Sequence, residues 1–173
     1  MLKRQLNSGP GPTGRARWQS VVTLGAAAST SMIVFGAGDL AHGSPVVGAG
    51  TQQVLARATT LDELKINFNG IHLRTHDEVD VVQAHFTADP GWSSGWHTHA
   101  GPAIITVKTG ALTTYNSRCQ KTVVPAGKAF VETPGVAVVV RNEGTTLTEW
   151  YTTQIIPVAA STREDAPQQC GKP

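Results

Sequence analysis

The apolar positions of this chain favour β structure. From Gln53 onward, short runs rich in Val, Ile and Thr alternate with clusters of Gly, Pro, Asn and Asp. Such runs, bounded by turn residues, are typical of β-strands. Strands are expected at 54–59, 65–67, 71–75, 79–87, 102–108, 111–115, 121–124, 128–133, 136–141 and 146–158. Many short strands at regular spacing predict an all-β sandwich or closed barrel of six strands or more.

The N-terminal 43 residues have a different pattern. A basic, Gly/Pro-rich stretch precedes an uncharged apolar run at 21–38, and the small residues Ala41 and Gly43 then occupy the −3 and −1 positions of a cleavage site. This arrangement predicts a secretory signal peptide over 1–43. A membrane anchor is the alternative, although Ser, Thr, Gly and Ala make the run weakly hydrophobic. Gly48-Ala49 is a second candidate cleavage point.

The domain plan follows from these two patterns. We expect a signal peptide or anchor at 1–43, a small-residue linker at 44–52, a single barrel at 53–160 and a polar C-terminal tail at 161–173. The protein would then be exported, to the medium, periplasm or cell envelope, without stable membrane insertion once the signal is cleaved.

Charge narrows the range of partners. The formal net charge of the whole chain is +2, but four basic residues and one acidic residue lie in 1–43. Residues 44–173 therefore hold ten basic and eleven acidic residues, a net charge of −1. No basic stripe remains on the predicted domain, which argues against nucleic acid as a partner.

The two cysteines, Cys119 and Cys170, are an even number in a chain predicted to be exported. This favours a disulfide that ties the tail to the barrel, and a loop of about 50 residues is worth ~4 kcal/mol in the chain-entropy picture. Two unrelated thiols are the alternative.

Candidate chemistry is concentrated at His97-Thr98-His99. On a strand, side chains two residues apart lie on the same face, so both imidazoles can bind one divalent metal. By the same parity Ala103, Ile105 and Val107 extend this face as an apolar wall.

The surrounding residues resemble the two motifs of the cupin family. Gly91, the His-x-His pair and Gly110 match the spacing of the first motif, and Gly135 and Asn142 match the second. The resemblance covers roughly 50–160 and implies a cupin-type jelly-roll β-barrel, a single domain that follows the signal or anchor segment. It also implies a small molecule bound in the barrel, often beside a metal.

Two positions depart from the family pattern. The motif's Glu falls on Ala103 and its second-motif His falls on Val138, so the resemblance carries over only His97 and His99 as metal ligands. Glu132, on the same strand face as Phe130, is the candidate third ligand. A His₂Glu set suits Fe(II), Mn or Zn. The alternative is that Glu132 faces solvent or pairs with Arg141, and that the barrel binds no metal.

We expect the ligand pocket to be lined by Trp96, Ile105, Val107, Phe130 and Val138. The resemblance does not select among dioxygenase, isomerase, decarboxylase and non-catalytic binding members, and a homodimer is compatible with it. The first hypothesis is a metal-assisted small-molecule-binding barrel. The second is a binding or structural barrel with a degenerate metal site.

Overall fold

The computed structural model describes residues 44–171, and these residues form an all-β domain. The predicted signal segment at 1–43 lies outside the described residues. The strands are β1 (Gly50–Thr59), β2 (Lys65–Phe68), β3 (Ile71–Arg74), β4 (Val79–Ala88), β5 (His97–Thr98), β6 (Ala103–Thr109), β7 (Ala111–Asn116), β8 (Lys121–Pro125), β9 (Ala129–Glu132), β10 (Val138–Arg141), β11 (Thr148–Pro157) and β12 (Glu164–Asp165). Among residues 44–171, no helix has the length and hydropathy needed to span a membrane.

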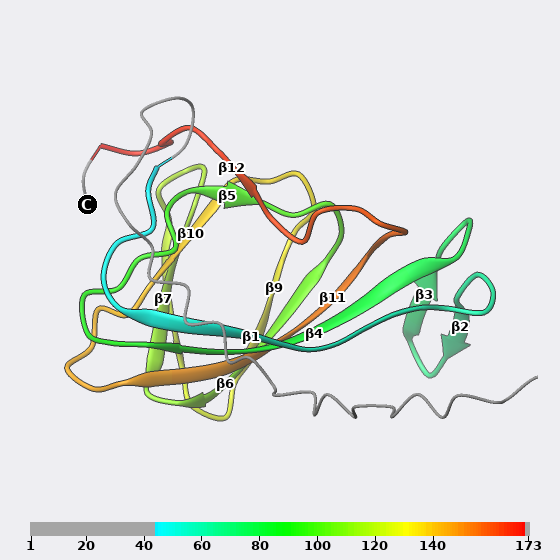
Figure 1. Ribbon diagram of the computed structural model, residues 1–173, viewed down its shortest axis with the longest axis horizontal. Helices are drawn as coiled ribbons and strands as arrows, with labels where there is room; N and C mark the ends of the chain where they lie inside the picture. Colours follow the sequence, from blue (N-terminus) through cyan, green and yellow to red (C-terminus); the bar gives the residue numbers. More distant parts are fainter. Residues whose placement is uncertain (1–43, 172–173) are drawn as a thin grey trace, which may run out of the picture.

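Two five-stranded antiparallel sheets form the barrel. The first has the order β1-β4-β11-β6-β9, and the second has the order β12-β5-β10-β7-β8. The sheets face one another across the core, as Figure 1 shows. Strand β11 is central to the first sheet, and its residues alternate between buried and more exposed positions along its length. This period of two is the pattern of a strand with one face on a core, and the expected all-β barrel is confirmed.

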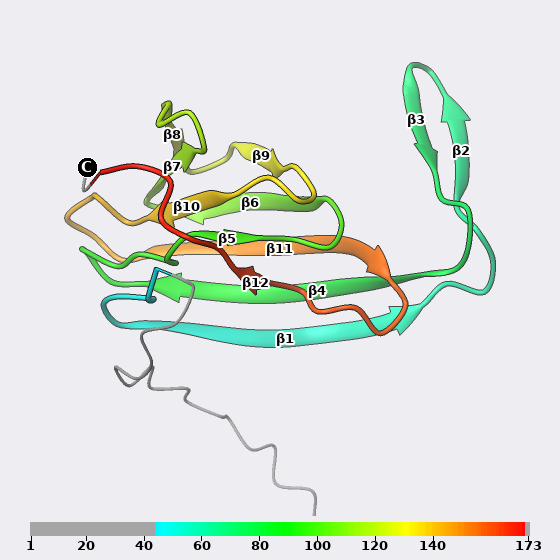
Figure 2. The same cartoon turned by 90° about the horizontal axis from the view of Figure 1, so that it is seen from above.

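Strands β2 and β3 form a hairpin that stands away from the barrel (Figures 1 and 2). Its turn is Asn69-Gly70, and both residues have positive φ, 46° and 80°. These are the dihedral signs of the type I′ turn that an Asn-Gly pair favours between two strands. At the base of this excursion the Thr60 amide donates to the Val79 carbonyl over 2.9 Å. The ladder between β1 and β4 is therefore already closed before the chain leaves the barrel.

The buried apolar residues form two clusters, one on each face of the second sheet. The larger cluster fills the barrel and includes Trp92, Ile105, Leu112 and Trp150. The smaller cluster consists of Trp96, Tyr115, Val139 and Ala166. Successive residues of β10 point to opposite faces, so Val139 and Val140 belong to different clusters.

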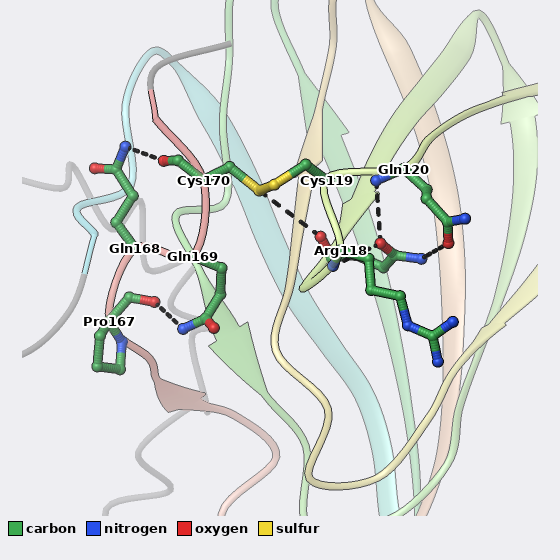
Figure 3. The surroundings of a disulfide bond; sticks show 8 residues. Arg118, Cys119, Gln120, Pro167, Gln168, Gln169 and Cys170 are labelled. Carbon is green, nitrogen blue, oxygen red and sulfur yellow. Dashed lines mark hydrogen bonds between the residues drawn. A yellow bond between two sulfur atoms is a disulfide. The ribbon is translucent and has the colours of Figure 1, made fainter.

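The C-terminal tail covers the outer face of the second sheet. Strand β12 pairs with β5, with Asp165 opposite His97, and the Ala166 amide donates to the Trp96 carbonyl over 2.9 Å. Cys170 then forms a disulfide with Cys119, with a Cα–Cα distance of 5.9 Å (Figure 3). The predicted disulfide is confirmed, and it fixes the end of the tail to the turn between β7 and β8.

Candidate metal centre

His97 and His99 lie at one end of the barrel interior. His97 begins β5, which is held between β10 and β12, and His99 follows directly after that strand. The turn that leads into β5 passes through Gly95, whose φ is 68° and whose added Cβ would lie 2.1 Å from the Ser44 carbonyl oxygen. Glycine is therefore required there. The side chains of both histidines are almost fully buried, with 4% and 7% of their residue surface exposed.

Glu132 reaches the same point from β9 in the opposite sheet. Its Oε2 lies 2.6 Å from His99 Nε2 and 3.8 Å from His97 Nε2. The ligand atoms of the three residues all lie within 4.8 Å of one another, and all three residues are buried. The structure thus brings together the three side chains that the sequence singled out as metal ligands.

The strand pairing accounts for this position of Glu132. Ala103 of β6 and Glu132 of β9 are directly opposite one another in the ladder. Directly paired residues place their side chains on the same face of a sheet. The carboxylate therefore enters the barrel at the level where the motif would place it, but from the neighbouring strand. Val138, where the motif would have its second-motif histidine, is in turn paired with His97.

The other imidazole nitrogens are held by the main chain. His97 Nδ1 donates to the Gly95 carbonyl over 2.9 Å, and His99 Nδ1 donates to the Thr162 carbonyl over 2.6 Å. A carbonyl oxygen can only accept, so each Nδ1 carries a proton. Each Nε2 is then directed towards Glu132, as in metal sites whose histidines are oriented by a second hydrogen bond. The contribution of Thr162 could not be found from the sequence, because any residue supplies a carbonyl.

Burial and pairing have opposite effects on the pKa values of Glu132 and His99. Burial raises the pKa of Glu132, but its interactions with the His97 and His99 imidazoles outweigh burial and lower this pKa to about 2. Burial lowers the pKa of His99, but the hydrogen bond and the charge of Glu132 outweigh it, so that this pKa is raised. Both shifts favour the ion-paired form of the metal-free cluster, with a carboxylate at Glu132 and a second proton on His99.

The donor set fits a divalent metal ion. Two neutral imidazoles and one carboxylate are a common ligand set for first-row transition metals. Glu132 Oε1 is buried and has no hydrogen-bond partner among residues 44–171. An unpartnered buried carboxylate oxygen is costly, and a cation that replaces the His99 proton would satisfy it.

A cavity of about 130 Å³ adjoins the three side chains. Of the predicted pocket residues, Ile105 and Phe130 line it, together with Trp92, Trp150 and Leu112. Trp96 packs in the smaller cluster on the other face of the second sheet. Val107 lies in the surrounding core, and Val138 is buried beside His97 without belonging to the cavity wall. The tryptophan in the wall is Trp92, which sequence parity alone did not distinguish from Trp96.

The remaining histidines of the described chain lie away from this centre. His85 is paired through Nε2 with Glu149 Oε1 at 2.8 Å and packs against Tyr151, which is exposed on the first sheet. His72 and His76 are exposed on and beside the β2–β3 hairpin.

Two comparisons with known proteins support the fold, one with a family model and one with a solved structure. A family model described as a cupin domain matches residues 84–153. An uncharacterised conserved protein with a double-stranded beta-helix domain from Klebsiella pneumoniae superposes with a TM-score of 0.51 at 20% identity, covering 73% of this chain and 92% of that one. A conserved protein of unknown function from Streptococcus pyogenes gives a TM-score of 0.42 at 15% identity, covering 60% and 77% of the two chains.

A predicted oxalate decarboxylase from Thermotoga maritima gives a TM-score of 0.40 at 21% identity, covering 46% of this chain and 81% of that one. No curated protein matches the chain.

Proposed function

We propose that this chain, whose residues 84–153 match a cupin-domain family model, is a small-molecule-binding barrel that holds a divalent metal on His97, His99 and Glu132. When bound, the metal would act as a Lewis acid on an oxygen atom of the ligand. The ligand set favours Fe(II), Mn or Zn.

One observation carries the proposal. Both histidines donate Nδ1–H to a main-chain carbonyl, so both Nε2 atoms are directed at the carboxylate of Glu132, whose second oxygen has no partner among the described residues. Oriented imidazoles and an unsatisfied buried oxygen at one point are expected of ligands prepared for a cation. Val138 adds no donor, so His97, His99 and Glu132 are the three ligands that the described residues offer at this point.

The protein's own residues have separate roles in this scheme. The carbonyls of Gly95 and Thr162 orient the imidazoles, and Glu132 supplies the negative charge. The buried aromatic wall excludes water from the ligand and lowers the local dielectric constant, which strengthens electrostatic interactions in the cavity.

A metal-free binding barrel is the second candidate function. Glu132 Oε2 lies 2.6 Å from His99 Nε2, and the lowered pKa of Glu132 and the raised pKa of His99 favour a carboxylate beside an imidazolium when no metal is present. In that case the three residues serve as a buried polar network, and the cavity binds its ligand without a metal.

We also propose that the protein works in an oxidising, extracytoplasmic compartment. The Cys119–Cys170 disulfide supports this, since such bonds persist mainly outside the reducing cytosol. The apolar run at 21–38, which the sequence analysis interprets as an export signal, points in the same direction.

The test is metal content by elemental mass spectrometry on untagged protein, compared with the Glu132→Gln variant. The amide keeps the shape of Glu132 but removes its charge. We expect near-stoichiometric metal in the parent, and an affinity in the variant that is lower by more than about a hundredfold, since loss of an orienting partner alone typically costs 10–100-fold. His72→Asn, on the exposed hairpin, is the matched control and should retain the metal.

A parent protein that neither contains metal nor takes up added Fe(II), Mn or Zn would overturn the metal site and favour the metal-free barrel. Equal metal binding by the parent and the Glu132→Gln variant would remove Glu132 from the ligand set.

A further inference from the structure

We propose that the cavity takes a neutral molecule of one-ring size, with a hydroxyl group at the Gln154 end and an apolar, preferably aromatic, body against Trp150. Phenol is the simplest member of this class. The inference deepens the proposed function, because it identifies the ligand of the same site, but it rests on the cavity wall and not on the metal.

The wall is arranged in layers that the strand register defines. In the first sheet, Gln154 is paired with Ala103, and Ala103 with Glu132, so Gln154 and Glu132 belong to one row across the barrel. The next row inward contains Thr152, Ile105 and Phe130. Along β9 the wall therefore changes from the polar Glu132 to the apolar Phe130 within two residues, beside the apolar Ala103 and Ile105 of β6.

The apolar end of the cavity is aromatic. Phe86 and Trp150 stack with ring centroids 5.2 Å apart and planes 7° apart. Trp92 lies against Trp150 at 5.4 Å with its ring tilted by 54°. All three residues line the cavity. A flat, apolar group packs on such a wall through offset-stacked or edge-on contacts.

Gln154 is a neutral polar group in this wall whose oxygen is unused. Only 6% of the residue is exposed, and its Oε1 has no hydrogen-bond partner among residues 44–171. Its Nε2 lies 3.3 Å from His99 Nδ1, the nitrogen that already donates to the Thr162 carbonyl. A hydroxyl group both donates and accepts, so it satisfies the free end of this amide in either orientation.

Arg163 does not favour an anionic ligand, although it lines the cavity. Its guanidinium donates to the Ser94 carbonyl over 2.8 Å and is paired with Asp165 at 2.8 Å. A carboxylate ligand could use only the donors that these partners leave free, and it would lie near the charge of Glu132. A neutral hydroxyl meets neither obstacle.

The size of the cavity sets the size of the body. Its volume of about 130 Å³ is close to the about 150 Å³ of an apolar protein cavity that binds benzene. One six-membered ring fits this volume, and two fused rings do not.

The experiment compares four probes on the full, disulfide-bonded protein by calorimetry, with and without bound metal: phenol, toluene, benzoate and 1-naphthol. We expect phenol to bind at least about tenfold more tightly than toluene, because an unpaired buried polar group costs more than one factor of ten in binding. Benzoate and 1-naphthol should bind more weakly than phenol.

Gln154→Leu should remove the preference for phenol over toluene while toluene still binds. Gln83→Leu makes the same chemical change on the exposed face of β4 and is the matched control, in which the preference should persist.

Equal binding of phenol and toluene to the parent, or a preference for benzoate or 1-naphthol, would overturn the inference. So would a phenol preference that survives in Gln154→Leu. These results are distinguishable from failure of the proposed metal site, since phenol binding in stripped protein tests the wall alone. Stoichiometric metal without a phenol preference would leave the metal proposal standing and this inference refuted.

Discussion

At the scale of single residues, the site is defined by where a strand places a carboxylate, not by which strand it comes from. Glu132 is paired with Ala103 across the ladder, so side chains at both positions enter the barrel at the same level. Ala103 is fully buried and has no metal-binding atom, so Glu132 supplies the carboxylate at this level. A departure from the family motif in the sequence is therefore compatible with a three-residue donor set.

Val138 provides a test of this arrangement. It is paired with His97, so a side chain at 138 lies on the same face as that imidazole. Val138→His should add a fourth donor and tighten metal binding by roughly tenfold or more, equivalent to about 1.4 kcal/mol. The measurement is competition titration against a chromophoric chelator.

Val123→His adds a histidine on the exposed surface of β8 and is the control for non-specific binding. If Val138→His and Val123→His bind metal like the parent, the side chain at 138 does not reach the site.

His97, His99 and Glu132 could be selected from the sequence because strand parity and spacing act locally. The convergence of Glu132 on the pair depends on the pairing of β6 with β9, which no local pattern specifies. The choice between Trp92 and Trp96 was equally inaccessible. These two residues flank the same loop, but one packs inside the barrel and the other beneath the tail.

At the scale of elements, Asp80 connects three parts of the barrel. Its carboxylate accepts hydrogen bonds from Thr59 Oγ1 and Arg57 on β1, at 2.7 Å and 2.6–2.8 Å, and from the Ala159 amide after β11 at 3.0 Å. These interactions, first that with Thr59, then those with Ala159 and Arg57, hold the pKa of Asp80 below its usual range.

The lowered pKa predicts a pH dependence of stability. A carboxylate with a depressed folded-state pKa stabilises the protein above its unfolded pKa, near 4, and this contribution is lost as pH falls through the folded pKa. Asp80→Asn should therefore lower Tm at pH 7 by several degrees, and the difference from the parent should narrow below about pH 4.

Differential scanning calorimetry from pH 3 to pH 8 measures this. A Tm difference that stays constant down to pH 3 would show that the charge of Asp80 is not responsible. Asp89→Asn, at an exposed loop position, controls for the loss of one surface charge.

The tail from Ser161 to Cys170 acts on the metal centre without providing a metal ligand. Thr162 orients His99, β12 pairs with β5, and Cys170 fixes the end of the segment. The sequence predicted the disulfide but gave the tail no periodicity, because a two-residue strand is too short to leave a pattern.

Replacing both cysteines by Ser should loosen this segment and weaken metal binding by about 10–100-fold, the usual cost of losing an orienting partner. The parent under confirmed reduction should behave in the same way. If the Ala166 amide becomes accessible to hydrogen exchange while the affinity for metal is unchanged, the tail does not influence the metal centre.

At the scale of the whole molecule, the barrel and the β2–β3 hairpin are separate units. The hairpin extends away from both sheets (Figure 2), and Phe68 and Ile71 are 69% and 63% exposed on it. The Thr60–Val79 hydrogen bond closes the β1–β4 ladder at its base. The excursion from 61 to 78 is thus an insertion between two strands that already pair.

Replacing residues 61–78 by Asn-Gly should leave the Tm within a few degrees of the parent and leave metal and phenol binding unchanged. The reason is that a two-residue turn connects paired antiparallel strands without strain. Calorimetry and the titrations above are the measurements. A large loss of Tm would mean that the hairpin stabilises the barrel.

The sequence was sufficient for the barrel class because short apolar runs and turn residues recur from Gln53 to the end of the predicted barrel. It was insufficient for the path of the tail and for the projection of the hairpin, since both depend on what each segment contacts, or fails to contact, after folding.

The hydrogen bond from His99 to the Thr162 carbonyl has a consequence for how the chain tolerates change. Every amino acid carries a main-chain carbonyl, so substitutions at 162 leave the acceptor in place. An inserted or deleted residue between Pro157 and Cys170 would instead shift the carbonyl along the barrel mouth. The length of this segment is therefore under stronger constraint than its composition.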